Sequence, residues 1–404
     1  MPTETILARR TRNMGASAIR EILKVVSRPG MISLAGGIPA PESFPMDMMQ
    51  EITERTIAQY GPAAFQYDLT EGFPPLREAL THYLAGKGLS ATPNEVLVAS
   101  GSQGVLDGLG KILISPGDHV ALEAPTYLGA LQAFAPYEPR YLEIATDDQG
   151  MLPDALETAL ARQPVKFIYM VPNFQNPTGR TLPAERRQAI ADIIRRYDTL
   201  LVEDDPYGDL RYHGVPVAPI KALAPDHVVY LSTLSKVFAP GLRMGFCLAP
   251  EPVGRWLVLA KQGVDLHTST FNQALATEYL TGGHLQRHLP RIIALYRPRQ
   301  QALLGAMKRY FPGDFNWTVP EGGMFVWVRG PAGMDMQAVN RQAVARNTAF
   351  VPGTFFYARP GSGRETLRLN YTMADEPALD RAAAILGEVF SMARLEMEAP
   401  RRVG

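Results

Sequence analysis

The segment KFIYMVP (166–172) is apolar from end to end and does not alternate between apolar and polar residues. Such a run is typical of a strand that is covered on both faces, as in a parallel sheet between two layers of helices. Five more short apolar or β-branched runs occur along the chain, and they are EVLVAS (95–100), HVALEAP (119–125), TLLVEDDP (199–206), VVYLSTLSK (228–236) and MGFCLAP (244–250). We therefore expect a central, mostly parallel sheet.

Segments with helical periodicity separate these runs. In PAERRQAIADIIRRY (183–197) apolar residues recur at helical spacing, at Ala189, Ile190, Ile193, Ile194 and Tyr197. Strands that alternate with helices indicate the α/β class.

The pattern changes near residue 285. A long amphipathic segment, LQRHLPRIIALYRPRQQALLGAMKRY (285–310), is followed by the strand-like runs GGMFVWVRG (322–330), AFVPGTFF (349–356) and LRLNYT (367–372). We predict three units. They are an N-terminal arm and helix at 1–45 that packs with the small domain, a large domain at 46–285, and a small α+β domain at 286–404.

Composition excludes several classes of protein and site. Forty Lys and Arg balance forty Asp and Glu among 404 residues, and no long basic block is present, so we expect no nucleic-acid partner. Cys247 is the only cysteine, which rules out an internal disulfide and a cysteine-based zinc site. The histidines show no metal-ligand spacing, and no apolar run is long enough to span a membrane. We expect a cytoplasmic protein without a metal.

Four polar loops follow predicted strands. They are SGSQGVLDGLG (100–110), FQNPTGR (174–180), VEDDPYGD (202–209) and STLSKVFAPGLRMGF (232–246). In open α/β sheets ligands bind beyond the carboxyl ends of the strands, so these loops are expected to meet at one site.

Each loop offers a different chemical group, and each has a plain structural alternative. The first places Ser102 and Gln103 at a helix start, which suits a phosphate, although a capped helix would look the same. The second presents the amide of Asn176, or is a simple turn. In the third, the alternation of a strand prevents Asp204 and Asp205 from pointing into one cavity, and a solvated acidic loop is the alternative.

The fourth loop carries a lysine directly after an apolar strand. A partly desolvated Lys236 would have a lowered pKa and act as a nucleophile, whereas a lone lysine is more often a surface residue. Arg243 follows seven residues later. The four loops together offer an amine, a phosphate cradle with an arginine, a carboxylate and an amide. This combination matches pyridoxal 5′-phosphate (PLP), whose protonated ring withdraws electrons from a carbanion.

A longer set of motifs covers nearly the whole chain. It consists of SAIREILK (17–24), SLAGGIPAPESFP (33–45), FQYDLTEGFPPLRE (65–78), SGSQGVLD (100–107), PTYLGALQAF (125–134), QNPTGR (175–180), EDDPY (203–207), LSKVFAPGLRMGF (234–246), KQGVDLHTS (261–269), GGMFVW (322–327) and LRLNYT (367–372). With these motifs the chain resembles the fold-type I, class I/II PLP-dependent aminotransferases, most of all the bacterial 2-aminoadipate and the kynurenine/aminoadipate aminotransferases. The resemblance implies a large PLP-binding domain with a seven-stranded type of sheet.

The resemblance also implies a role for individual residues. Lys236 would bind PLP covalently and later move a proton at the substrate Cα. Asp204 would pair with the pyridinium nitrogen, while Asn176 and Tyr207 would hydrogen-bond the ring hydroxyl. The phosphate would be held by Ser102, Gln103, Thr233, Ser235 and Arg243.

Further roles concern the substrate and the subunit interface. Tyr127 would stack on the ring, or is a core residue. Arg368 would bind the α-carboxylate, with Asn176 and Gly37 beside the substrate. Tyr67 would reach the cofactor from a neighbouring subunit, which implies a homodimer. Ser17 and Arg20 would bind a distal carboxylate of the substrate, although Arg20 on an amphipathic helix also fits a solvated charge.

The function implied is amino transfer from an L-amino acid to 2-oxoglutarate by a ping-pong cycle, with 2-aminoadipate, leucine or an aromatic amino acid as donor. A PLP-dependent β-lyase or decarboxylase of the same fold is the first alternative, since the fold does not select the bond that breaks. A regulator that uses an aminotransferase-like domain to sense an effector is the second.

Overall fold

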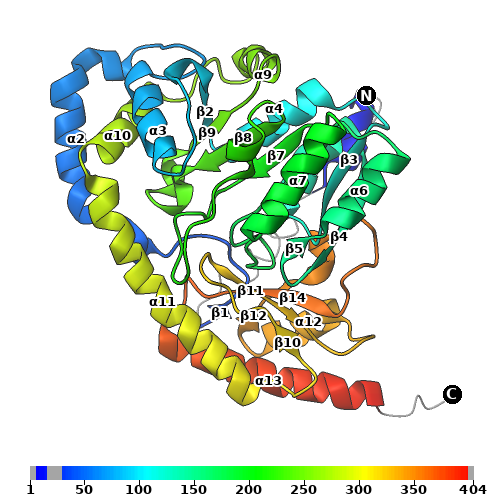
Figure 1. Ribbon diagram of the computed structural model, residues 1–404. Coiled ribbons are helices and arrows are strands. Elements are labelled where there is room, and N and C mark those ends of the chain that lie inside the picture. Colours follow the sequence, from blue (N-terminus) through cyan, green and yellow to red (C-terminus); the bar gives the residue numbers. More distant parts are fainter. Residues whose placement is uncertain (1–5, 16–29, 399–404) are drawn as a thin grey trace.

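The computed structural model describes residues 6–15 and 30–398 (Figure 1). Its larger sheet has the strand order β2-β9-β8-β7-β6-β3-β4-β5. The strands are β2 (Val96–Ser100), β3 (His119–Ala124), β4 (Arg140–Asp147), β5 (Gly150–Met151), β6 (Phe167–Met170), β7 (Leu201–Asp204), β8 (Val228–Thr233) and β9 (Met244–Leu248). Strands β4, β3, β6, β7 and β8 pair in parallel, whereas β9 is antiparallel to both of its neighbours. The predicted mostly parallel central sheet is confirmed, and the two-residue β5 extends the seven-stranded type to eight.

Both faces of this sheet are covered by helices. Along β6, Phe167 and Tyr169 join the core on one face, and Ile168 and Met170 join the core on the other. The first core includes α3 (Pro74–Ala85), α4 (Ser102–Leu113), α5 (Leu128–Phe134), α9 (Val253–Gln262) and α10 (Thr270–Thr281). The second core includes α6 (Pro153–Arg162), α7 (Ala184–Arg196) and α8 (Ile220–Leu223). This burial on two sides explains why KFIYMVP has no polar alternation.

Two strands of the larger sheet, β4 and the two-residue β5, are missing from the sequence prediction. Strand β4 carries Arg140, Glu143 and Asp147, and most of its residues are only half-buried. Its outer neighbour β5 pairs with Thr146 and Asp147 alone, so the rest of β4 is an edge. An edge strand tolerates charged side chains, and its sequence therefore lacks the continuous apolar signal of the inner strands.

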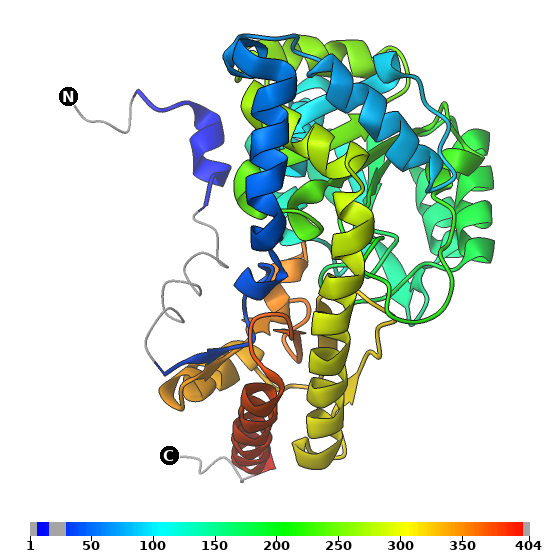
Figure 2. The same cartoon turned by 90° about the vertical axis from the view of Figure 1, so that its left-hand side faces the viewer.

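A second, antiparallel sheet has the order β10-β11-β14-β13. Its strands are β10 (Asn316–Trp317), β11 (Phe325–Arg329), β13 (Val351–Pro352) and β14 (Thr366–Asn370). Beside it β1 (Ile32–Ser33) pairs in parallel with β12 (Thr348–Ala349). The other α-helices within the described residues are α2 (Met46–Tyr60), α11 (His284–Tyr310), α12 (Met336–Ala345) and α13 (Glu376–Glu398). Figures 1 and 2 show α11 extending from the larger sheet to the small one, where α13 packs against it.

The small sheet follows residue 285 in the chain, as the sequence predicts, and the domain limits at 45 and 285 stay predictions. Within the described ranges, no helix has both the length and the apolar character that crossing a bilayer requires.

Candidate active site

A cavity of about 410 Å³ lies where the loops after β2, β6, β7 and β8 meet. Twelve of the residues singled out from the sequence line it, namely Gly37, Ser102, Gln103, Tyr127, Asn176, Asp204, Tyr207, Thr233, Ser235, Lys236, Arg243 and Arg368. Ile38, Val171, Pro206 and Pro240 complete the lining and are apolar. The convergence expected of the four loops is therefore observed.

Lys236 ends a single 3₁₀ turn that follows β8. Its Nζ lies 3.4 Å from the carbonyl oxygen of Gly37. Burial, reinforced by the positive charges of Arg243 and Arg368, lowers the pKa of Lys236 to about 8. A substantial fraction of this side chain is consequently the neutral, nucleophilic amine at slightly alkaline pH.

Asp204, at the carboxyl end of β7, is buried, and its two carboxylate oxygens differ in their contacts to the described residues. Its Oδ2 accepts a hydrogen bond of 2.8 Å from the hydroxyl of Tyr169. Its Oδ1 has no hydrogen-bond partner among the described residues. Burial, with a smaller contribution from Asp205, raises the pKa of Asp204 to about 7. A buried, unpartnered carboxylate oxygen in this cavity fits the protonated ring nitrogen of PLP.

Asp205 lies on the other side of the strand and has its polar atoms satisfied. Its Oδ1 accepts from the Nδ2 of Asn173 at 2.9 Å and from the backbone N–H of Gly208 at 3.0 Å, and its Oδ2 accepts from the Tyr230 hydroxyl at 2.9 Å. Asp204 lines the cavity and Asp205 does not. The prediction that only one of the two carboxylates enters the site is confirmed.

The start of α4 and the segment around Arg243 form a tight cradle. Gly101 precedes α4 with a φ of 88°, and a Cβ at this position would overlap the guanidinium of Arg243. A Cβ on Gly245 would collide with the backbone of Gly101 and Ser102. Backbone N–H groups at a helix N-terminus beside an arginine suit a phosphate group, so this corner fits the phosphate of PLP.

The side chains of the predicted phosphate site make contacts of their own. The Thr233 hydroxyl donates to the carbonyl oxygen of Met244 at 2.7 Å and lies 2.9 Å from the Ser235 hydroxyl. The Nε2 of Gln103 donates to the carbonyl oxygen of Gly129 at 2.7 Å. These bonds hold the three side chains at the cavity wall.

The small sheet supplies Arg368 from β14. Its Nη1 donates to the Oδ1 of Asn176 at 2.7 Å, and its Nη2 donates to the carbonyl oxygen of Ala35 at 2.9 Å. The guanidinium lies 4.2 Å from the ring centre of Phe325 and 5.0 Å from that of Phe356. Burial lowers the pKa of Arg368 to about 10. A buried guanidinium fixed in this way is well suited to bind a carboxylate.

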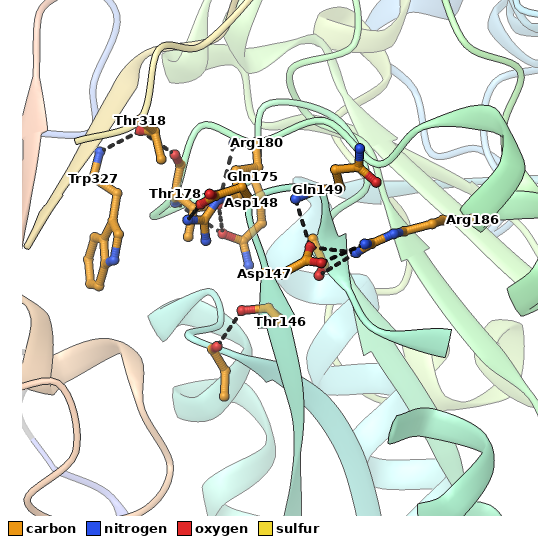
Figure 3. A network of polar contacts seen from close by, with 12 residues as sticks. Thr146, Asp147, Asp148, Gln149, Gln175, Thr178, Arg180, Arg186, Thr318 and Trp327 are labelled. Atoms are coloured by element: carbon orange, nitrogen blue, oxygen red, sulfur yellow. Dashed lines mark hydrogen bonds and ion pairs between the residues drawn. The ribbon is translucent and has the colours of Figure 1, made fainter. Parts of the chain in front are cut away.

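Asn176 links the two sheets because its loop contacts both. Its Nδ2 donates to the Tyr207 hydroxyl at 3.4 Å, while its Oδ1 accepts from Arg368. Figure 3 shows how the loop is fixed: the Oε1 of Gln175 accepts from the N–H and hydroxyl of Thr178, and the Thr318 hydroxyl donates to the Thr178 carbonyl oxygen at 2.8 Å.

Three neighbours of the predicted residues are missing from the sequence analysis. Tyr169 contacts Asp204, and Phe325 with Phe356 flanks Arg368. A signal for Tyr169 exists, because a tyrosine inside a doubly covered strand needs a buried partner for its hydroxyl. The aromatic pair has no such local signal.

Tyr67 does not line this cavity. Tyr67 is 78% exposed and packs edge-on against His267, with ring centres 5.7 Å apart. Ser17 and Arg20 lie outside the described residues.

Comparisons with known proteins agree over nearly the full length. The family described as "Aminotransferase class I and II" matches residues 30–386. "Aromatic-amino-acid aminotransferase 1" of Thermococcus litoralis is 43% identical over 392 residues, 95% of this chain and 94% of that protein. "2-aminoadipate transaminase" of Thermus thermophilus is 41% identical over 376 residues, 92% of this chain and 93% of that protein. The crystal structure of the alpha-aminoadipate aminotransferase of Thermus thermophilus complexed with N-(5′-phosphopyridoxyl)-L-leucine has a TM-score of 0.91 and 38% identity, and the match covers 98% of this chain and all of that one.

Proposed function

This chain belongs to the class I and II aminotransferases, and on that premise we propose that it transfers the amino group of an L-amino acid to 2-oxoglutarate in a ping-pong cycle. It is a transaminase of the fold-type I group, PLP is its cofactor, and its substrates are an amino acid and a 2-oxo acid. One observation carries the proposal: a single cavity combines the amine of Lys236, the unpartnered oxygen of Asp204 and the guanidinium of Arg368.

Each of these three groups has a separate task in the proposal. When bound, PLP supplies an electron sink for the electrons left at the substrate Cα. Lys236, with its pKa near 8, provides the amine that attaches the cofactor, and it takes and returns the proton at Cα. Asp204 keeps a proton at the ring nitrogen through its Oδ1.

Arg368 is proposed to bind the α-carboxylate of both substrates. Its Nη1 and Nη2 are held by Asn176 and Ala35, and the rings of Phe325 and Phe356 fix the plane of the guanidinium. Its buried Nε has no hydrogen-bond partner among the described residues. A fixed fork loses little side-chain freedom when a planar carboxylate binds.

The side chain of the donor is proposed to be apolar, aromatic or aminoadipate-like. Ile38, Val171, Pro206 and Pro240 give the cavity apolar walls, and Ile38 is 48% exposed. The two relatives above are named for aromatic amino acids and for 2-aminoadipate. For acidic donors we propose that Arg20, with Ser17, binds the distal carboxylate. Arg20→Ala should then lower kcat/KM for aminoadipate about ten- to a hundredfold and leave leucine nearly unchanged.

A homodimer is proposed from an exposed apolar surface. Phe65, Tyr67 and Leu69 are 68%, 78% and 51% exposed, and Val264 and Leu266 are 67% and 50% exposed. The two segments adjoin, because Phe65 stacks on Phe271 and Tyr67 contacts His267. Apolar surface of this kind marks a protein interface, and a second copy would bring Tyr67 toward a partner's site. Light scattering at assay concentration should find a dimer; a fully active monomer would refute it.

The proposed activity is tested with the purified chain and PLP. Consumption of an amino donor together with 2-oxoglutarate, with glutamate as product, is the expected result. Borohydride reduction followed by peptide mapping should place the pyridoxyl label on Lys236. Label on Lys261 or Lys111 would overturn the assignment of the amine, and release of ammonia or carbon dioxide without glutamate would indicate a lyase or a decarboxylase.

A further inference from the structure

The hydroxyl of Tyr169 contacts Asp204, the residue proposed to face the ring nitrogen of PLP. Tyr169 is a β6 residue with no exposed surface, and its ring packs edge-on against Phe134, with ring centres 6.0 Å apart. Its hydroxyl donates to the Oδ2 of Asp204 at 2.8 Å. Tyr169 is not part of the cavity lining, so it reaches the site only through Asp204.

The two oxygens of the Asp204 carboxylate therefore have different surroundings. Oδ2 is held from inside the protein by Tyr169, and Oδ1 has no partner among the described residues. A hydrogen bond to one oxygen fixes the rotation of the carboxylate, which sets the direction of the other oxygen's lone pairs. The free oxygen is thereby oriented before any ligand binds.

The charge of Asp204 also depends on its neighbours. The titratable groups that interact with it are Tyr169, Asp205, Tyr127 and Tyr207. Burial and the negative charge of Asp205 raise the pKa of Asp204, and the hydrogen bond from Tyr169 lowers it. Tyr127 and Tyr207 are themselves buried phenols whose pKa values are raised, so they remain neutral. Of these neighbours, Tyr169 is the one that favours the ionised carboxylate.

We propose that Tyr169 is a positioning residue for the transaminase reaction: its hydroxyl keeps Asp204 ionised and aims Oδ1 at the ring nitrogen of PLP. This inference rests on the role proposed above for Asp204. A carboxylate that took up a proton could not hold the ring nitrogen protonated, so the electron sink would weaken.

The chain contains a matched control for this bond. Tyr230 lies on β8, the strand next to β7, and is also fully buried. Its hydroxyl donates to the Oδ2 of Asp205 at 2.9 Å. Asp205 does not line the cavity. Tyr169→Phe and Tyr230→Phe thus remove the same kind of tyrosine–aspartate hydrogen bond. The first bond is made to an aspartate that lines the cavity, and the second to an aspartate that does not.

The experiment uses both variants as PLP-loaded enzyme. Three quantities are measured: the pH dependence of the absorbance of bound PLP, the dissociation constant of PLP from the apoenzyme, and the single-turnover rate with leucine against pH. Tyr169→Phe should lower that rate about ten- to a hundredfold near neutral pH, because a charge-assisted hydrogen bond is lost. It should also move the acid limb of the rate profile to higher pH, shift the pH titration of the absorbance and weaken PLP binding. Tyr230→Phe should change only thermal stability.

The outcomes separate this inference from the function itself. If Tyr169→Phe matches Tyr230→Phe in absorbance, pH profile and rate, the inference is wrong, whereas Asp204→Ala would still abolish turnover. If Asp204→Ala keeps its turnover, the role of Asp204 fails and the inference fails with it.

Should Tyr169→Phe not fold, a ring-fluorinated tyrosine in place of Tyr169 keeps the shape and makes the hydroxyl a stronger donor. The acid limb should then move to lower pH, and an unchanged limb would overturn the inference.

Discussion

The two sheets each contribute a wall to the lining of the cavity, and they hold their charged groups in different ways. On the wall of the larger sheet, Lys236 has one long contact to Gly37, and one oxygen of Asp204 has no partner within the described part of the chain. On the wall of the small sheet, Arg368 is fixed by two hydrogen bonds and two aromatic rings. Among the described residues Arg368 also has an unpartnered atom, Nε, but its guanidinium is held at two other nitrogens, whereas Lys236 and Asp204 each have one polar contact. The groups proposed to react are thus held loosely, and the group proposed only to bind is held rigidly.

The largest effect is expected on the wall of the larger sheet. Asp204→Ala keeps Lys236 and should still bind PLP, but turnover should fall about a thousandfold or more, which is about 4 kcal/mol of barrier. The physical reason is that the ring nitrogen loses its acceptor. Stopped-flow absorbance with one amino donor measures the rate.

Asp205→Asn is the control for that variant. Because Asp205 bonds to Asn173, Gly208 and Tyr230 away from the cavity, this change should lower the melting temperature and keep turnover within about tenfold of the wild type. A loss below tenfold in Asp204→Ala, with a large loss in Asp205→Asn, would transfer the role to Asp205.

The wall of the small sheet should respond differently. Arg368→Lys keeps a positive charge but loses the fork between Asn176 and Ala35 and the contact with two rings. We expect kcat/KM to fall about thirtyfold, chiefly through a higher KM for the amino acid, since charge-assisted hydrogen bonds contribute about 1.5–3 kcal/mol. PLP affinity measured by titration of the apoenzyme should stay near the wild-type value; a parallel loss of PLP binding would contradict the separation of the two walls.

The sequence predicts these two walls unequally. KFIYMVP and the other inner strands are recognisable because burial on both faces leaves a continuous apolar run. The alternation of β7 predicts that one of Asp204 and Asp205 enters the cavity, but local pattern does not say which. The edge strand β4 has no such run and is missed.

The site residues of the small sheet depend on packing between distant segments. Arg368 meets Asn176 across 192 residues of chain, so its place follows from the resemblance to the family and not from spacing. Tyr169 is not recognisable as a site residue from the sequence, because a tyrosine within an apolar strand has the pattern of a core residue. Its hydroxyl matters only because β7 places Asp204 beside it. The sequence therefore predicts residues with a local signal better than the residues that support them.

A smaller effect is expected where the walls influence each other through charge. The ammonium of Lys236 is disfavoured by burial and by the positive charges of Arg243 and Arg368, which together lower its pKa to about 8. Removing one positive charge favours protonation, so Arg368→Gln should raise the pKa of Lys236. PLP binding to the apoenzyme needs the neutral amine, so its rate rises with pH. In Arg368→Gln the midpoint of this rise should lie at higher pH than in the wild type, and the rate at pH 8 should be about threefold lower. A midpoint at lower pH would contradict the prediction.

The smallest effect is expected at the contact that joins the walls. Thr318 donates to the carbonyl oxygen of Thr178 at 2.8 Å and accepts from the N–H of Trp327 at 3.0 Å, so it fastens the loop of Asn176 to β11 (Figure 3). Thr318→Val keeps the shape and removes both bonds, at a cost of about 0.5–1.5 kcal/mol each. The loop should then hold Asn176 less firmly against Arg368, and KM for the amino acid should rise only about twofold with kcat nearly unchanged. Thr277→Val is the control, because its hydroxyl donates to the Gln273 carbonyl oxygen within α10 and is not part of the cavity. Equal changes in KM for both variants would show that the loss is one of general stability, and an unchanged KM in Thr318→Val would show that Arg368 positions Asn176 without help from this contact.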